Sequence, residues 1–220
     1  PMHNVEFIML EWYDVGADIM SGIDTTGALV CQVLQTPRFD VTTYRDAFSA
    51  ALGIDPITES LARLHSKTAD IDALLAKDIA QDRDAMLDVL FTHHVQPGLG
   101  REVPVAVRNY PLTQAALARQ ASDDELCAAR FEMFFKGVEL ANGYDELLDA
   151  DVLIERTRSN NQRRIACGES ALPVDNTLVQ AMRRGLPAST GVALGFDRLL
   201  MLQTMSNSID NVVPLTIEIA

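Results

Sequence analysis

The hydrophobic pattern at the start of the chain predicts a β-strand. Over residues 3–13, side chains alternate so that Phe7, Met9, Glu11 and Tyr13 fall on one face. That face therefore carries a carboxylate and a phenol beside apolar side chains. This makes the opening strand the first of three candidate functional segments.

Helical spacing with recognisable ends predicts most of the remaining elements. Helices are expected at residues 18–34, from Thr42 or Thr43 to Leu52, from about Thr58, and at residues 82–95, 151–167, 176–184 and 197–203. A further short helix is expected to begin at residues 123–125, which are acidic, with Ser122 as its cap. Gly53, Gly168 and Gly185 stand where three of these helices are expected to end.

Strand-like segments complete the pattern. They are residues 103–107, 129–136, 138–141 and 190–194. The dipeptide Asn142-Gly143 is typical of a tight turn, so a hairpin is expected around it. The mixture predicts a single α+β domain in which an antiparallel sheet is flanked by helices.

Length and composition agree with one globular domain. The chain has 220 residues, of which 48% are hydrophobic and 22% charged. It lacks an apolar run of about 18 residues or more, so no membrane span is expected. Cys31, Cys127 and Cys167 do not have the spacing of a zinc site or of a disulfide framework. Reduced thiols in a cytoplasmic protein are the expectation.

The charge balance argues against one class of function. With 31 acidic residues against 18 lysines and arginines, the formal net charge is −13. Proteins that grip nucleic acid usually present basic patches, because neutralising phosphates supplies much of the affinity. A large RNA-binding surface on this chain is therefore not expected. A small anion such as a nucleotide needs only a few cations, so nucleotide binding stays open.

Two further segments carry candidate chemistry. Residues 139–147, Glu-Leu-Ala-Asn-Gly-Tyr-Asp-Glu-Leu, place Glu139 and Glu146 on either side of a glycine, so that a hairpin would turn both acids toward one pocket. Residues 191–199, Gly-Val-Ala-Leu-Gly-Phe-Asp-Arg-Leu, join a strand of small residues to Arg198 on the next helix, which suits a flat ligand. Taken singly, each segment has a plainer interpretation: a turn, a solvated acid, or a packed strand followed by a helix cap.

Taken together and in order, the three segments resemble those of a known family. The run that ends in Glu11-Trp12-Tyr13 resembles the second half of motif 2 of class II aminoacyl-tRNA synthetases, and residues 191–198 resemble motif 3. Residues 139–147 resemble a segment of lysyl-tRNA synthetases. Over essentially its whole length, the chain resembles the PoxA/GenX family of elongation factor P–(R)-β-lysine ligases, which are truncated paralogues of lysyl-tRNA synthetase.

The resemblance implies a class II synthetase catalytic fold and an ATP-dependent ligase. A lysine-type amino acid would be activated as its adenylate and passed to a lysine of elongation factor P. Arg198 matches the arginine that contacts the γ-phosphate, and Glu139 matches the position that meets ATP and Mg²⁺, a hard ion that favours oxygen ligands. The other matches to nucleotide-binding positions are His3, Asn4, Leu140 and Gly195.

The amino-acid end of the site is also implied by the resemblance. Glu146 and Tyr13 match residues that hold the amino-acid side chain, and Glu11 is a second carboxylate for the other amino group. Several acids in one pocket suit a diamine, since a terminal ammonium pairs with carboxylate and phenol oxygens. Ala193 stands where lysyl-tRNA synthetases usually have glycine, and its methyl group is expected to favour β-lysine over α-lysine.

The resemblance also implies what this chain does not contain. Residues 1–220 are expected to be the carboxy-terminal two thirds of the catalytic domain, without motif 1 and without the motif 2 arginine for the α-phosphate. A homodimer is expected to form through that missing segment. The alternatives are a lysyl-tRNA synthetase fragment, which Ala193 and the acidic charge oppose, and an inactive remnant. The presence of Arg198, Glu139 and Glu146 opposes the second alternative.

Overall fold

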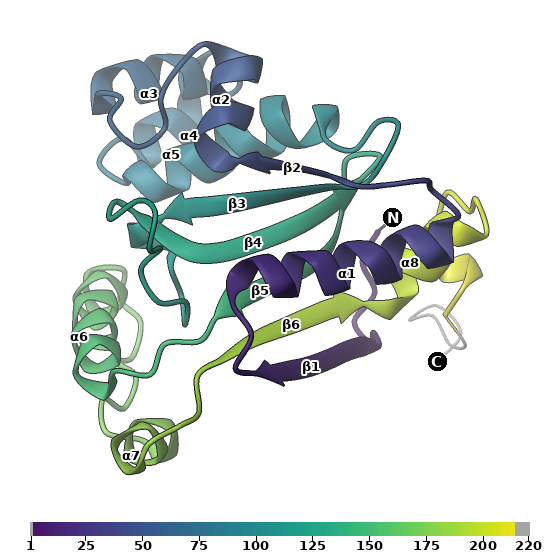
Figure 1. Cartoon of the computed structure of the whole chain (residues 1–220). Coiled ribbons are helices and arrows are strands. Elements are labelled where there is room, and N and C mark those ends of the chain that lie inside the picture. The colour runs from purple at the N-terminus through teal and green to yellow at the C-terminus, as the bar shows by residue number, and fades with distance from the viewer. Residues whose placement is uncertain (1, 214–220) are drawn as a thin grey trace.

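A single mixed sheet organises the chain. The computed structural model describes residues 2–213. Its six strands lie in the order β1-β6-β5-β4-β3-β2 (Figure 1). Within this part of the chain β2 pairs in parallel with β3, and the other neighbouring pairs are antiparallel. The strands are β1 (Met9–Val15), β2 (Asp40–Thr43), β3 (Val105–Pro111), β4 (Cys127–Phe135), β5 (Val138–Asp145) and β6 (Ser189–Gly195).

The helices begin close to where the sequence places them. Asp18, Thr43, Ser60, Asp82 and Asn176 each accept a backbone N–H at a helix start, which satisfies a donor that has no partner within the helix. The helices are α1 (Ile19–Leu34), α2 (Tyr44–Leu52), α3 (Leu61–Ala69), α4 (Ala73–Asp78), α5 (Arg83–Leu90), α6 (Ala150–Ala166), α7 (Thr177–Arg184) and α8 (Phe196–Gln203). A π-helical turn (Phe91–Val95) continues α5, and short 3₁₀ turns occupy Gln96–Gly98, Leu112–Gln114 and Ile209–Asn211. The α+β fold class is confirmed.

Helix α1 covers one face of the sheet (Figure 1). Ile23 and Val30 are fully buried there, in one cluster with Phe131 of β4 and Leu194 of β6. The helix lies so close to β6 that a side chain at Gly22 would collide with Thr190. A glycine that weakens a helix by propensity is therefore needed for packing, which explains why α1 forms in spite of it.

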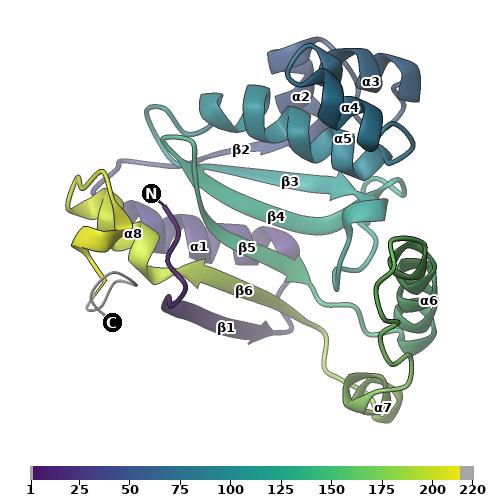
Figure 2. The same cartoon turned by 180° about the vertical axis from the view of Figure 1, so that it is seen from behind.

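The opposite face is covered at one end and open at the other. Helices α2–α5 gather at the β2 end of the sheet (Figure 2). Tyr44, Phe48 and Leu90 pack there against Val107 and Phe134 in a second buried cluster. Helices α6 and α7 connect β5 to β6 and lie beyond the ends of these strands. The part of this face made by β5, β6 and β1 therefore remains accessible.

The prediction of a hairpin turn at Asn142-Gly143 is wrong. Both residues lie inside β5, and the turn between β4 and β5 occurs at Lys136-Gly137, where both φ angles are positive. Gly143 is present because the Phe131 ring fills the place of a side chain, with its Cζ only 2.7 Å from an ideal Cβ. A glycine required by packing was thus taken for a glycine required by a turn.

Four smaller expectations also need correction. The opening strand begins at Met9 rather than at residue 3, and β3 continues through Tyr110-Pro111. No helix starts at Asp123, because Arg108 and Asn109 donate hydrogen bonds to its carboxylate, at 2.7 and 3.1 Å. The sheet is not wholly antiparallel because β2, a short strand that the pattern did not predict, joins it in parallel.

None of the helices in residues 2–213 is both long and apolar enough to cross a bilayer.

Candidate active site

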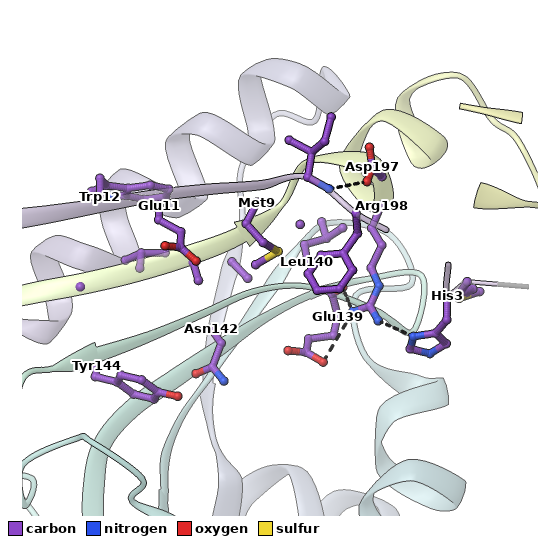
Figure 3. A pocket seen from close by; sticks show the side chains of 18 of the residues that line it. His3, Met9, Glu11, Trp12, Glu139, Leu140, Asn142, Tyr144, Asp197 and Arg198 are labelled. Carbon is purple, nitrogen blue, oxygen red and sulfur yellow. Dashed lines mark hydrogen bonds and ion pairs between the residues drawn. The ribbon is translucent and has the colours of Figure 1, made fainter. Parts of the chain in front are cut away.

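A cavity of about 540 Å³ occupies the open face of the sheet (Figure 3). Its walls come from β1, β5 and β6, from the start of α8, and from residues 2–8. Every site residue expected from the sequence lies in this lining: His3, Asn4, Glu11, Tyr13, Glu139, Leu140, Glu146, Ala193, Gly195 and Arg198. Segments that are far apart in the chain therefore meet in one cavity.

Strand register explains the arrangement of the floor. Gly191, Ala193 and Gly195 alternate along β6 and so share its open face. Gly191 pairs with Tyr13 on β1, and Ala193 pairs with Glu11. The small residues of β6 thus form a low central strip between the taller side chains of its neighbours.

The two glycines of this strip differ in what surrounds them. A side chain at Gly191 would collide with the Glu146 carboxylate and would lie 2.8 Å from the Tyr13 ring. At Gly195 an added Cβ would meet its nearest neighbours at 3.8 Å, which is ordinary van der Waals contact. A side chain at position 191 would therefore displace Glu146 and Tyr13 from their places in the cavity. At position 195 the space above the backbone belongs to the cavity.

Arg198 organises the end of the cavity near α8. Its Nη1 donates to the carbonyl oxygen of Glu139 at 3.0 Å and lies 3.7 Å from the Glu139 carboxylate. Its Nη2 lies 3.3 Å from Nδ1 of His3 (Figure 3). Arg198 therefore joins β5 to the segment before β1.

Asp197 fixes that segment in place. Its side chain is almost fully buried and accepts a hydrogen bond from the Ile8 amide at 2.8 Å. The amide of Phe196 donates in turn to the Ile8 carbonyl oxygen at 3.0 Å. The start of α8 thus holds residues 3–8 along the rim of the cavity, which places His3 and Asn4 in its lining.

Two glutamates in the cavity have perturbed pKa values. Burial and the nearby charge of Glu132 raise the pKa of Glu139, while Arg198 and Arg130 act in the opposite direction. Burial and the charge of Asp145 raise the pKa of Glu146. Both carboxylates are therefore held where their negative charge is incompletely solvated, a situation that a bound cation would relieve.

Asn142 and Tyr144 are cavity residues that the sequence analysis missed. They alternate along β5 and lie in the lining beside Glu139 (Figure 3). Oδ1 of Asn142 is buried and has no hydrogen-bond partner among the described residues, so it is an acceptor available to a ligand. Alternation counted back from Glu146 predicts both, because Tyr144 and Asn142 then share its face. Alternation counted forward from Glu139 does not, since the register of β5 shifts after Glu139.

The cavity offers carboxylate oxygen ligands for a divalent cation only at a few positions, of which Glu139 is one. Within residues 2–213 no group of three or more His, Cys, Asp or Glu side chains is placed to hold a metal ion by itself. Glu139 nevertheless presents a partly exposed carboxylate to the cavity. Mg²⁺ is commonly held by one or two carboxylates together with substrate phosphates. The residues therefore fit a metal that arrives with a nucleotide.

Comparison with known proteins agrees with this geometry. A family model described as class II tRNA synthetases (D, K and N) matches residues 1–218. A protein of Pectobacterium atrosepticum named elongation factor P–(R)-β-lysine ligase is 41% identical over 219 residues, which cover 98% of this chain and 66% of the relative. Proteins of the same name from Klebsiella pneumoniae and Yersinia pestis are 40% and 38% identical, and the chain covers 66% and 67% of their lengths.

The motif resemblance is thus confirmed by independent comparison over nearly the whole chain, although the chain spans only about 66% of the length of the first two relatives. The matching family model and the convergence of the motif residues lead to the same conclusion: this chain belongs to the class II tRNA synthetase family.

Proposed function

We propose that this protein is an ATP-dependent ligase that activates (R)-β-lysine as its adenylate and transfers it to a lysine of elongation factor P. One observation carries the proposal. An acidic, phenol-bearing end of the cavity lies next to an arginine-bearing end, on the same open sheet face. The ammonium groups of a lysine-type amino acid complement the acidic end, and the phosphates of a nucleotide complement the arginine-bearing end. The relatives' name supplies the amino acid and the acceptor.

The acidic end would hold the amino acid. The Glu146 carboxylate and the Tyr13 ring lie side by side over Gly191. A carboxylate whose charge is poorly solvated gains from an ammonium partner, and the phenol offers a directional oxygen. Glu11, one step along β1, would receive the second amino group.

The opposite end would hold the nucleotide. Arg198 provides a planar guanidinium for the γ-phosphate, and the space over Gly195 allows the nucleotide to lie against the backbone. His3, Asn4 and Leu140 complete this end of the lining. Contacts with Glu139 and His3 keep the guanidinium in the cavity.

Glu139 would also hold Mg²⁺, and the bound ion would neutralise phosphate charge. Amino-acid activation is an attack by the substrate carboxylate on the α-phosphate, with loss of pyrophosphate. No protein nucleophile is needed, so the residues act by holding two reactants in line and by balancing charge. Arg198 stabilises negative charge on the phosphates, while Glu146 and Tyr13 orient the amino acid.

Ala193 would set the choice of amino acid. It is paired with Glu11, between the two ends of the cavity. Its methyl group takes space that a glycine would leave to an α-amino group, whereas the amino group of β-lysine is displaced by one carbon. A methyl-sized change in a pocket discriminates by about 1–3 kcal/mol.

Further parts of the proposal concern the whole protein. We take residues 1–220 as the carboxy-terminal two thirds of a class II catalytic domain, with homodimerisation through the remaining part. We also infer a cytoplasmic location, which suits the free thiols of Cys31, Cys127 and Cys167. Extensive tRNA binding is not proposed, since the net charge is −13.

ATP–pyrophosphate exchange by the purified protein tests the proposal. Exchange is measured with (R)-β-lysine, with α-lysine and without amino acid, for the parent and for Arg198→Lys, which keeps the charge but loses the planar fork. Stronger stimulation by β-lysine, weakened in the variant, is expected. Stronger stimulation by α-lysine would favour a lysyl-tRNA synthetase fragment instead. Absence of exchange with every substrate would contradict activation by this protein.

A further inference from the structure

A second cleft, of about 420 Å³, lies beside the candidate active site. It runs between the helical group at the β2 end and strands β3 and β4. Glu139 lines both the cleft and the active-site cavity, so the two spaces meet at that carboxylate. None of the functions assigned above uses the rest of the cleft.

The walls of the cleft combine aromatic rings with acids. Tyr44, Phe91, Tyr110 and Phe134 contribute its rings, and Asp88, Glu132 and Glu139 its carboxylates. Ring faces attract cations and cover methylene groups, while carboxylates pair with ammonium groups. An alkylammonium group is the ligand class that such a lining recognises.

Part of this polar set is already satisfied within the protein. Glu132 accepts hydrogen bonds from Arg130 at 2.5 Å and from the Tyr110 hydroxyl at 2.7 Å. Arg130 lies over the Tyr110 ring, 4.6 Å from its centroid, and donates to the Gln114 carbonyl oxygen. Glu132 and the terminal nitrogens of Arg130 are thus engaged within the protein. Nε of Arg130 is buried without a partner among the described residues, but it is a donor and cannot receive an ammonium group.

Two oxygen acceptors in the lining of the cleft have unused hydrogen-bonding capacity. The Tyr44 side chain is 1% exposed, yet its hydroxyl has no hydrogen-bond partner among the described residues. A buried hydroxyl without a partner is costly, and native structures usually satisfy it with water or a ligand. The second group is Asp88, which accepts a bond from the Gln114 amide at 2.9 Å and retains further acceptor capacity.

The electrostatics of the cleft support a cationic ligand. Burial and the neighbouring charge of Asp84 raise the pKa of Asp88 to about 6, although Arg130 and the Gln114 hydrogen bond act against the shift. Asp88 and Glu132 also contribute to the high pKa of Tyr44, after burial itself. Negative potential is therefore in excess around Asp88, even with Arg130 present.

We propose that this cleft admits the lysine side chain of the acceptor protein, with Asp88 and Tyr44 receiving its ammonium group on the way to the active site. The inference rests on the proposed function, and it assigns a route to the second substrate. The aromatic walls would cover the methylene groups, and the junction at Glu139 would deliver the nitrogen to the adenylate.

The transfer step is balanced without a further reactant. The ammonium group first loses one proton to water and becomes an amine. Its nitrogen attacks the carbonyl carbon of the aminoacyl adenylate, and a C–N bond forms. The C–O bond to phosphate then breaks, AMP leaves with the electron pair, and the new amide nitrogen releases its second proton.

The test separates the two half-reactions. Asp88→Asn and Tyr44→Phe are compared with the parent and with Asp78→Asn, a control that removes one exposed acid at the end of α4, outside the cleft. Exchange of pyrophosphate reports adenylate formation. Transfer is measured as mass gain of elongation factor P from Pectobacterium atrosepticum, and hydroxylamine serves as a small nucleophile that needs no side-chain channel.

We expect Asp88→Asn to raise the KM for elongation factor P by about tenfold, since a hydrogen bond to a charged group is lost. Tyr44→Phe should raise it by a smaller factor while leaving Tm unchanged or higher, because it removes an unsatisfied hydroxyl. Pyrophosphate exchange and hydroxamate formation should stay at parent levels in both cleft variants. Asp78→Asn should match the parent in every assay. If both cleft variants transfer at the parent rate, this inference is overturned and the proposed function stands. If the parent protein shows no pyrophosphate exchange, the proposed function itself is overturned.

Discussion

The Glu146 carboxylate occupies the space that a side chain at Gly191 would fill. The two residues are 45 positions apart. Glu146 directly follows β5, and the pairing of β5 with β6 brings it to Gly191. The glycine is thus part of the candidate amino-acid site although it presents no functional group. The same place on β6 also brings the Tyr13 ring close to Glu146.

Gly191→Ala is expected to damage amino-acid binding selectively. The added methyl group displaces Glu146 and Tyr13, so the KM for the lysine-type substrate should rise by roughly tenfold or more, in line with the loss of a hydrogen bond to a charged group. The KM for ATP should change little, since the nucleotide end is unaffected. Exchange kinetics at varied amino-acid and ATP concentrations measure both constants.

Gly195→Ala is the matched control on the same strand. Its methyl group meets protein atoms only at ordinary contact distance, so Tm should stay close to that of the parent. If the nucleotide lies over this position, the KM for ATP rises instead of the KM for the amino acid. Equal effects of the two substitutions on both constants would contradict the division of the cavity into two ends.

Ala193→Gly is expected to restore the use of α-lysine. Removal of the methyl group opens space between the two ends of the cavity, and the ratio of exchange rates for β-lysine and α-lysine should fall by about tenfold. Ala193→Ser keeps a group of similar size and should retain the parent ratio. An unchanged ratio in the glycine variant would refute a role for Ala193 in selectivity.

Glu146→Gln is expected to stabilise the protein at neutral pH while abolishing activation of the amino acid. The folded state raises the pKa of Glu146 above its ordinary value of 4.5, so ionisation penalises folding as pH rises through the folded pKa. Removing the charge should raise Tm by about 1–3 °C at pH 7 to 8, a modest gain because solvent screens this half-exposed group. The gain should vanish below about pH 4.5, where the carboxyl group is protonated in both states. Thermal melts across this pH range measure it, and a gain that persists at low pH would assign the effect to packing instead.

Much of the local structure could be predicted because its causes are local. Asp18, Thr43 and Asn176 cap helices through hydrogen bonds that span three residues, and such signals are visible in sequence. The candidate site was likewise found from short motifs, and all ten residues line one cavity. Their binding roles remain predictions that the variants above test.

The errors arose where distant residues decide the local structure. Asp123 does not begin a helix because Arg108 and Asn109, fifteen and fourteen residues away in sequence, donate hydrogen bonds to its carboxylate. Strand β2 is short and polar, and it forms because β3 offers a parallel partner. Asn142 and Tyr144 were missed for the same reason, since the Phe131 ring determines that Gly143 continues a strand. Sequence patterns do not contain these contacts.

Gly143→Ala tests whether this glycine serves packing or a turn. Its φ angle is not positive, so alanine imposes no backbone strain, but the new methyl group collides with the Phe131 ring in a close-packed core. Overpacking of this kind costs about 1–3 kcal/mol, which urea denaturation measures as a lower midpoint. Gly98→Ala is the control, because an added Cβ there meets no atom within 4 Å and the stability should be nearly unchanged. The double variant Gly143→Ala with Phe131→Leu should recover part of the loss, because the smaller side chain leaves room for the methyl group. A turn at this position would show no such recovery, since shortening a side chain on β4 cannot relieve strain in a backbone turn.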